Sequence, residues 1–277
     1  MKSITKLMVV AMLLAAALVV APAAAARTIT ENGSTVYIGE ENVNLTAIFD
    51  HPAGGGEGVL VYYSSTTGSG DDRSGTIEKT ISVANTSDFE LTATDFGSLT
   101  GQWYAFAEGD KDLTALATAD GNILVQKPSV KLNVKLWDKE KGKVSADSVD
   151  GKTVTRKSDI AFEIEHNLGG VDPAFQIDIE VTTPSGGKLT TFGEELKGID
   201  LTGQKVPKGP ISLEGREAGT YTAVAKWPSS SDFYDKGYDS NTVTFEILTK
   251  KLAISSNKDS VVRGNNFVVT ITGESKT

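Results

Sequence analysis

The stretch "GQWYAFA" at Gly101–Ala107 decides the fold, because it recurs as "GTYTAVA" at Gly219–Ala225. The two stretches align position for position, with Trp103 on Tyr221. In both, a glycine precedes a run of aromatic, β-branched and small residues, which is typical of a β-strand that follows a turn. The recurrence indicates an internal repeat, so we expect more than one copy of the same domain.

Each copy opens with a short strand and a polar turn. The three openings are "TVYIGEENVNLTAI" from Thr35, "TVTRKSDIAFEI" from Thr153 and "SVVRGNNFVVTI" from Ser260. Val36 lies 67 residues before Trp103. Val154 lies the same 67 residues before Tyr221, and this equal spacing favours two complete copies followed by the start of a third.

Segments of alternating apolar and polar residues, separated by glycine-rich turns, predict β-strands along the chain. Short strands in domains of about 100 residues are typical of antiparallel sandwiches. We therefore expect an all-β fold of tandem immunoglobulin-like β-sandwiches, with Tyr221 in the place of a tyrosine corner. The expected strands include Val59–Tyr63, Thr76–Val83, Val130–Leu136, Phe175–Val181, Tyr221–Lys226 and Thr242–Ile247.

These landmarks predict the domain boundaries. Residues 1–26 form a signal peptide, residues 27–127 a first β-sandwich and residues 128–249 a second. Pro128 is a linker residue, because proline cannot continue a central strand. Residues 250–277 begin a third β domain, so the sequence is expected to be the N-terminal part of a longer array.

The first residues of the chain predict export. Lys2 and Lys6 precede an uncharged apolar run at 7–20, and alanines follow up to residue 26. The run of 14 residues is shorter than the roughly 20 that a transmembrane helix needs. Cleavage after Ala26 would release a secreted, cell-surface protein that begins at Arg27.

Composition limits the classes of function. The net charge of −9 becomes −11 without the signal peptide, with 25 Lys and Arg against 36 Asp and Glu. An acidic chain without a basic cluster is not expected to bind nucleic acid. Because there is no cysteine, each domain must be held by its own core. His51 and His166 lie outside any hydrolase or zinc motif, so no enzymatic activity is expected.

Acidic pairs are frequent but give no catalytic signal. Glycoside hydrolysis needs two carboxylates that face one cleft. Glu40 and Glu41 adjoin each other at an expected turn. Glu163 and Glu165 flank Ile164 in an expected strand, so both point to one face of the sheet, which we expect to be the solvent side.

Three sequons fit the acceptor rule for N-linked glycans in an exported chain. They begin at Asn32, Asn44 and Asn85.

The stretch "KWPSSSDFYDKGYDSN" at 226–241 carries two further candidate sites. Its aspartates could hold Ca²⁺ or Mg²⁺ through hard oxygen ligands, or form solvated acidic turns. Its aromatic rings could stack on a sugar, or cover the end of the domain and its junction with the third. No cofactor is required. The aspartates are Asp232, Asp235 and Asp239, and the rings are Trp227, Tyr234 and Tyr238.

The order of these features resembles the surface-layer (S-layer) glycoproteins of archaea, particularly methanogens and more distantly halophiles. The matching residues are the signal peptide, "GSTVYIGEENVNLTA" at 33–47, the two Gly-x-Trp/Tyr strands and "SVVRGNNFVVTITGES" at 260–275. The family implies rows of immunoglobulin-like domains, N-linked glycans, dependence on divalent cations, lateral assembly into a lattice and a C-terminal membrane anchor. The sequence departs from it in lacking that anchor and a Thr-rich stalk, as an N-terminal portion would.

The leading hypothesis is a structural cell-surface protein whose copies assemble into an envelope lattice, with membrane contact only through an anchor outside this sequence. The alternative is an extracellular adhesin or carbohydrate-binding module. A third hypothesis is a hydrolase whose catalytic part lies beyond Thr277.

Overall fold

The structure is a computed structural model that describes residues 27–52, 54–107, 109, 112–248, 253–256 and 268–272. This part of the chain is almost all β, as the sequence predicts, and its one α-helix is the single turn α2 at Ala93–Phe96. No helix among the described residues has the length and apolarity to cross a bilayer. The expected signal peptide lies outside the described residues.

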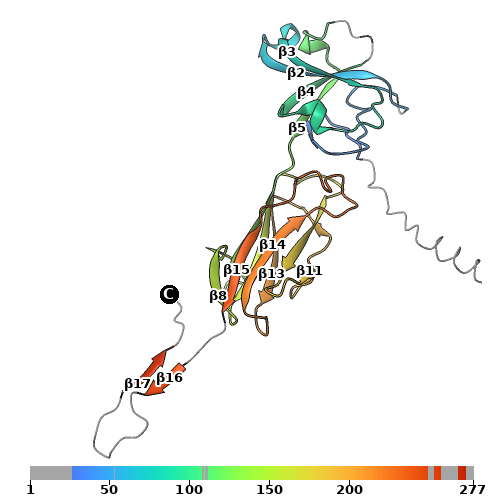
Figure 1. Cartoon of the computed structure of the whole chain (residues 1–277). Helices are drawn as coiled ribbons and strands as arrows, with labels where there is room; N and C mark the ends of the chain where they lie inside the picture. The colour runs from blue at the N-terminus through green and yellow to red at the C-terminus, as the bar shows by residue number, and fades with distance from the viewer. Residues whose placement is uncertain are drawn as a thin grey trace, which may run out of the picture. The chain divides into compact units, whose positions relative to one another are not determined.

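The chain divides into two compact units (Figure 1). Unit 1 comprises the described residues up to Pro128 together with the segment Trp227–Tyr238. Unit 2 comprises those of Ser129–Lys226 and from Asp239 onward. The expected second domain was continuous in sequence, whereas the structure groups Trp227–Tyr238 with residues that precede it by almost 200 positions.

Unit 1 is built on one five-stranded sheet in the order β1-β5-β4-β2-β3. β1 and β5 are parallel, and all other neighbours are antiparallel. One face is covered by irregular segments joined by isolated bridges, Thr28 with Asn44 and Val43 with Phe89, in place of a second full sheet. The elements are β1 Ser34–Tyr37, β2 Gly58–Thr67, η1 Gly70–Asp72, β3 Ser74–Val83, β4 Gly101–Ala107, η2 Leu116–Thr118 and β5 Gly121–Gln126.

The β4 strand is apolar from Trp103 to Ala107 because both faces of the sheet are covered there. Trp103 and Ala105 belong to the core under the irregular segments. Tyr104 and Phe106 point to the opposite face, where Leu116 packs against them. Alternate residues of a strand face opposite sides, so a sheet buried on both sides needs a continuous apolar run.

Unit 2 is a sandwich of two sheets. One has the order β11-β10-β14-β15-β8, with β12 beside β10, and the other has the order β13-β9-β6-β7. Phe162 of β9 and Phe245 of β15 meet between them with ring centroids 6.5 Å apart. The elements are β6 Val130–Asp138, β7 Lys143–Ser148, β8 Lys152–Thr155, β9 Asp159–His166, β10 Gln176–Thr182, β11 Lys188–Leu189, β12 Ile199–Asp200, β13 Lys205–Ser212, β14 Gly219–Lys226 and β15 Val243–Leu248.

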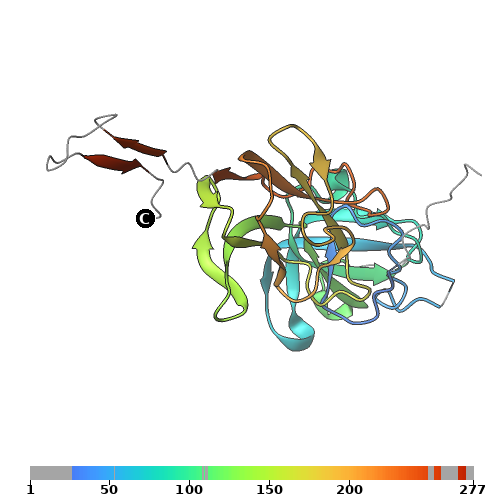
Figure 2. The same cartoon turned by 90° about the horizontal axis from the view of Figure 1, so that it is seen from below.

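A separate antiparallel pair follows, formed by β16 at Ala253–Ser256 and β17 at Val269–Thr272 (Figure 2). The rest of the expected third domain, 250–277, lies outside the described residues.

The two units share an arrangement of three strands, which we call the repeat frame. It consists of β1, β5 and β4 in unit 1, and of β8, β15 and β14 in unit 2. In each unit the middle strand pairs in parallel with the opening strand and antiparallel with the Gly-x-Trp/Tyr strand. In unit 1, Val125 of the middle strand pairs with Val36 and Gly101. In unit 2, Ile247 pairs in the same way with Val154 and Gly219. The sequence repeat is therefore a repeat of strand register.

The aromatic landmarks anchor the repeat frame in the same way. The Tyr221 hydroxyl donates a hydrogen bond to the Glu217 carbonyl at 3.0 Å, which confirms the predicted tyrosine corner. The Trp103 indole N–H donates to the Leu99 carbonyl at 3.4 Å, also four residues upstream. Trp103 lacks a hydroxyl, and its indole nitrogen supplies the equivalent donor.

We expect Tyr221→Phe to lower the free energy of unfolding of unit 2 by about 0.5–1.5 kcal/mol, because the Glu217 carbonyl loses its donor. Tyr234→Phe makes the same chemical change at a ring that is 53% exposed, and it should stay within about 0.5 kcal/mol. Urea unfolding of both variants measures the difference. Equal effects of the two substitutions would contradict a structural role for the Tyr221 hydroxyl.

Candidate functional site

The three predicted glycosylation sites all lie in unit 1. Asn32 and Asn85 are exposed, whereas Asn44 is half-buried and the Thr46 of its sequon is only 8% exposed. Asn85 Oδ1 accepts hydrogen bonds from the backbone N–H and the hydroxyl of Ser87, which holds that sequon in a surface turn. Geometry therefore favours Asn32 and Asn85 as acceptors over Asn44.

The predicted calcium ligands do not converge. Asp232 is half-buried, and its Oδ2 accepts a hydrogen bond from the Glu41 backbone N–H at 3.1 Å. Asp235 and Asp239 are exposed in the same loop. Across the described residues, no group of three or more acidic or histidine side chains is arranged to hold a metal ion. The structure therefore does not bring these three aspartates together as one set of ligands, and the calcium site stays a prediction.

Two of the three predicted sugar-stacking rings, Trp227 and Tyr238, form a small core with Phe233. Trp227 is only 2% exposed, its indole N–H donates to the Tyr238 carbonyl at 2.9 Å, and its ring meets Phe233 edge-on at 4.7 Å. Tyr238 is half-buried and packs at 6.0 Å from Phe233. A buried ring offers no face to a sugar, so the prediction is wrong for Trp227. Tyr234 alone of the three remains open.

This small core packs on the turn that follows β1. A Cβ at Gly39 would lie 3.1 Å from the Tyr238 ring and 3.2 Å from the Phe233 ring, and the φ of Gly39 is +106°. Only glycine combines that backbone conformation with so close an approach. The turn "GEEN" of the first opening therefore receives the segment Trp227–Tyr238.

Polar contacts fix the same interface within unit 1. The Lys236 ammonium donates to the Gly39 carbonyl at 3.0 Å and forms an ion pair with the Glu41 carboxylate. In addition, the Asp232 carboxylate accepts a hydrogen bond from the Glu41 backbone N–H. Burial raises the pKa of Asp232, while the hydrogen bond from Glu41 opposes that rise.

A buried ion pair lies beneath this turn. Glu40 is 1% exposed, and its Oε2 accepts from Arg27 Nη2 at 2.6 Å and from the Tyr37 N–H at 2.8 Å. Burial raises the pKa of the Glu40 carboxyl, and the Arg27 guanidinium opposes this. Arg27 also donates to the Thr35 carbonyl at 3.0 Å. The first residue of the expected mature chain is thus tied into unit 1.

The second acidic pair of the sequence analysis, Glu163 and Glu165, forms ion pairs with lysines of neighbouring strands. Glu163 lies 2.5 Å from the Lys135 ammonium, and Glu165 lies 2.6 Å from Lys205. These contacts run across β6, β9 and β13 on one face of the sheet, as the alternation around Ile164 predicts. Their geometry is that of cross-strand charge pairs.

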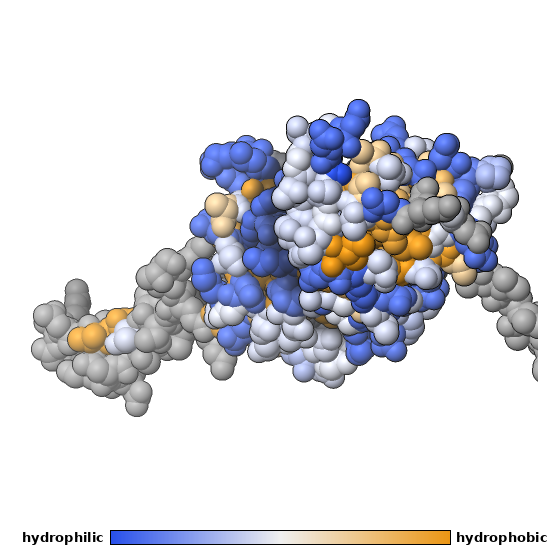
Figure 3. Space-filling view, turned by 90° about the horizontal axis from the view of Figure 1, so that it is seen from above, coloured by the Kyte–Doolittle hydropathy of each residue, from blue (hydrophilic) through white to orange (hydrophobic). Residues whose placement is uncertain are grey.

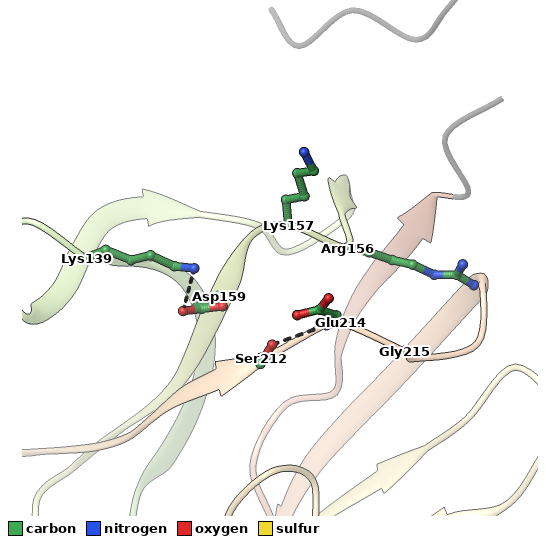
Figure 4. A pocket seen from close by; sticks show the side chains of 7 residues that line it. All are labelled: Lys139, Arg156, Lys157, Asp159, Ser212, Glu214 and Gly215. Atoms are coloured by element: carbon green, nitrogen blue, oxygen red, sulfur yellow. Dashed lines mark hydrogen bonds and ion pairs between the residues drawn. The ribbon is translucent and has the colours of Figure 1, made fainter. Parts of the chain in front are cut away.

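A polar cavity of about 520 Å³ lies at one end of unit 2, beside the turn that joins β8 to β9 (Figure 4). Lys139 points at Asp159, with 2.9 Å between Nζ and Oδ2. Arg156 and Lys157 point away from that pair, and neither forms an ion pair with a described carboxylate. The Arg156 Nε is buried without a hydrogen-bond partner. The lining residues are Lys139, Arg156, Lys157, Asp159, Ser212, Glu214 and Gly215.

Few large apolar side chains are exposed among the described residues. The large apolar side chains that stay exposed are Ile77, Tyr234, Val268 and Val269. On the face drawn in Figure 3, apolar residues show in several places among polar ones.

The two histidines serve local structure. The His51 Nδ1 lies 3.2 Å from the Thr86 hydroxyl, and its ring stacks on Phe49. The His166 Nδ1 accepts from the Leu168 N–H at 3.2 Å, and its Nε2 is buried without a partner.

Acidification should destabilise unit 2 through His166. Burial lowers the pKa of His166 in the folded state, so the unfolded chain binds the proton first as pH falls below about 6.5. Stability is therefore complete above that pH and declines below it, by at most about 1.4 kcal/mol per pH unit for one proton. His166→Asn keeps an acceptor for Leu168 and should remove this slope. Urea unfolding of both proteins between pH 7.5 and 5 tests this, and parallel profiles would contradict it.

The fold and these contacts define an all-β protein that repeats one strand frame in two units. The chain belongs to the family described as "Domain of unknown function (DUF3821)", whose match covers residues 32–271. No curated protein matches the chain.

Proposed function

We propose that this chain is an exported structural protein whose copies assemble into an S-layer lattice on the cell surface. The observation that carries the proposal is the repeat frame, because the same register of β1, β5 and β4 returns in β8, β15 and β14. Tandem copies of one rigid β domain are suited to building extended assemblies.

We also propose that the two units are immunoglobulin-like domains. Two packed sheets, antiparallel except for the β8–β15 pair, and the Tyr221 corner support this in unit 2. In unit 1 the shared frame and the Trp103 corner support it, while the irregular second layer is a departure from the usual sandwich.

The mechanism follows from symmetry and charge. Contacts between identical copies repeat across a lattice, so individually weak contacts suffice for a stable layer. The excess of carboxylates favours divalent cations as bridges between acidic surfaces of neighbouring copies, at sites that no single loop would form alone. Glycans at exposed asparagines would keep one surface hydrated.

Glycan occupancy is the first expected result. Mass spectrometry of the protein from its native cells should find glycans at Asn32 and Asn85 more often than at Asn44, because Asn44 and Thr46 are the least accessible. The reverse order would contradict the surface assignment. Peptides that begin at Arg27 would establish the expected export cleavage in the same experiment.

Electron microscopy tests the assembly. The purified chain from residue 27 to 277, concentrated with Ca²⁺ or Mg²⁺, should form ordered sheets or filaments, and chelation should disperse them. A chain that remains monomeric at every concentration and in both ions would overturn the proposal.

The adhesin alternative is disfavoured because Trp227 is buried, which leaves Tyr234 as the exposed ring of that segment. A glycan array separates the two functions. Micromolar sugar binding that Tyr234→Ala abolishes would favour the adhesin.

A further inference from the structure

The outer face of one sheet of unit 2 carries a row of threonines. Thr182 of β10 pairs with Thr222 of β14, and Thr222 pairs with Thr244 of β15. Alternate residues of these strands are buried in the core, so the three threonines point away from it. They are half-buried, and their hydroxyls form no hydrogen bond with the described residues. We call the outer surface of β10, β14, β15 and β8 the threonine face; three of its strands, β14, β15 and β8, are labelled in Figure 1.

The corresponding face is covered in unit 1. In the repeat frame, Tyr104 of β4 takes the place of Thr222, and Phe106 takes the place of Val224. Both rings are buried against Leu116, which the connection from β4 to β5 brings over that side of the sheet. This side of the repeat frame is therefore a packing surface in one of its two copies.

Unit 2 leaves the same side open. Its connection from β14 to β15 contributes the segment Trp227–Tyr238 to unit 1. Thr222 and Val224 remain partly exposed. Where unit 1 has two aromatic rings that need a cover, unit 2 has a threonine and a valine on a surface that can receive a partner.

The chemistry of the threonine row suits an identical partner. A threonine hydroxyl both donates and accepts a hydrogen bond, so a row of hydroxyls can bond to a second copy of itself. The centre of a protein interface is poor in charged side chains, and the row itself carries none.

The charges that flank the row are complementary between its two sides. On one side, the exposed ammonium groups of Lys188 and Lys226 share the Glu180 carboxylate, at 3.1 and 3.0 Å. The lysine side chains are 63% and 40% exposed, whereas that of Glu180 is only 23% exposed. The other carboxylate on this side, Asp178, accepts a hydrogen bond from a backbone N–H. This side therefore presents positive charge to a partner.

The opposite side of the row presents negative charge. Glu246 lies two residues beyond Thr244 on β15 and is exposed. Its Oε2 accepts a hydrogen bond from the Thr153 hydroxyl at 3.4 Å, and it forms no ion pair with the described residues. A second copy turned about an axis along the row would bring its lysines to this carboxylate.

We propose that two copies of this chain pair through their threonine faces. The two-fold axis runs along the threonine row, so the hydroxyls meet at the centre and the lysine side of each face meets Glu246 of the other. Such a contact is isologous and closes a dimer, which further contacts would join into a layer. The inference rests on the proposed function, since it names one contact by which copies would assemble.

Sedimentation velocity of the chain from 27 to 277 tests the pairing. The sedimentation coefficient of the wild type should rise with protein concentration and level off at the value of a dimer. Thr222→Lys with Thr244→Lys sets like charges against each other at the centre and should weaken association by at least about tenfold. Thr66→Lys with Thr76→Lys makes the same change of charge at exposed threonines of β2 and β3 and should leave association near the wild-type value. Circular dichroism checks that every variant is folded.

Chemical cross-linking measures the same contact without a change of charge. The chain has no cysteine, so Thr244→Cys introduces a unique thiol. Packed sheets lie about 10 Å apart, and a bismaleimide of about that span should convert this variant into covalent dimers. Thr66→Cys places a thiol on an exposed strand of unit 1 and should stay monomeric under the same conditions.

A charge exchange tests the orientation of the pair. Glu246→Lys should weaken association, because it meets the lysine side of the other copy. Adding Lys188→Glu reverses the charge of that side as well and should restore association. If Glu246→Lys has no effect, or if Lys188→Glu does not restore pairing, the two-fold arrangement is wrong.

The outcomes separate this contact from the proposed function. Association that survives the Thr222 and Thr244 changes, or equal cross-linking of the two cysteine variants, would overturn the threonine face as the contact. The proposed function would then still stand. A wild-type chain that sediments as a monomer but forms ordered sheets with Ca²⁺ or Mg²⁺ would likewise overturn the pairing alone. A chain that neither pairs nor forms sheets would overturn both.

Discussion

Replacing Arg27 by methionine is expected to lower the free energy of unfolding of unit 1 by about 3–5 kcal/mol at pH 7, because it leaves the buried Glu40 carboxylate without its cation. Only 1% of the Glu40 side chain is exposed, and the Arg27 Nη2 at 2.6 Å is its charged partner. The remaining hydrogen bond from Tyr37 does not neutralise the charge. Urea unfolding followed by tryptophan fluorescence measures the loss.

The loss should depend on pH in a defined direction. Burial already raises the pKa of Glu40 in the folded state, and removal of Arg27 raises it further. The folded variant then takes up a proton at a higher pH than the unfolded chain does, so acidification favours the folded state. The Arg27→Met protein should therefore regain stability relative to the wild type as pH falls from 7 toward the ordinary range of a glutamate.

Two further variants make this result specific. Arg27→Met combined with Glu40→Gln removes the unpaired charge and should recover most of the loss at pH 7. Lys139→Met removes a cation that is 61% exposed from its pair with Asp159, and should cost no more than about 1 kcal/mol. If Arg27→Met costs as little as Lys139→Met, the Arg27–Glu40 pair does not stabilise unit 1 as the geometry indicates.

The second large effect is expected at the aromatic landmark of unit 1. Trp103→Ala should lower the free energy of unfolding by about 3–5 kcal/mol, because the fully buried indole packs against Phe96 at 4.9 Å and Tyr62 at 5.2 Å. Trp103→Tyr should cost less, since a tyrosine holds the same place in unit 2 and bonds the carbonyl four residues upstream.

A surface control and a clear contrary result complete this test. Glu78→Ala changes an exposed side chain of β3 and should stay within about 0.5 kcal/mol. If Trp103→Tyr destabilised unit 1 as much as Trp103→Ala, the equivalence of the two landmarks would be contradicted, even though the strand registers agree.

The repeat could be predicted from the sequence because similar strand motifs recur at the same spacing. Val36 and Val154 each precede an aromatic landmark by 67 residues, and the structure places both beside the middle strand of the repeat frame. The apolar residues Ile177, Ile179 and Val181 alternate with polar ones, which predicts a strand there, and all three are fully buried in β10. Alternation is visible within a few residues, and the repeat is visible when the sequence is compared with itself, so neither needs knowledge of the tertiary fold.

The candidate sites could not be predicted in the same way, because they depend on contacts distant in sequence. Lys236 and Gly39 are 197 residues apart, and no spacing rule relates them. The density of aspartates around Asp232 suggested a metal site, yet convergence of oxygen atoms is a property of the folded loop. The sequence left two roles open for the rings of this segment, stacking on a sugar or covering the end of the domain. In the structure Trp227 and Tyr238 pack on Phe233, while Tyr234 stays exposed.

The central claim, that copies of this chain form a surface layer, is tested most directly by electron cryotomography of cells that make it, labelled with antibody fragments against unit 2. We expect label on the outer surface at a regular spacing that repeats in two dimensions. Label confined to the cell interior, or scattered on the surface without a repeat, would contradict the claim.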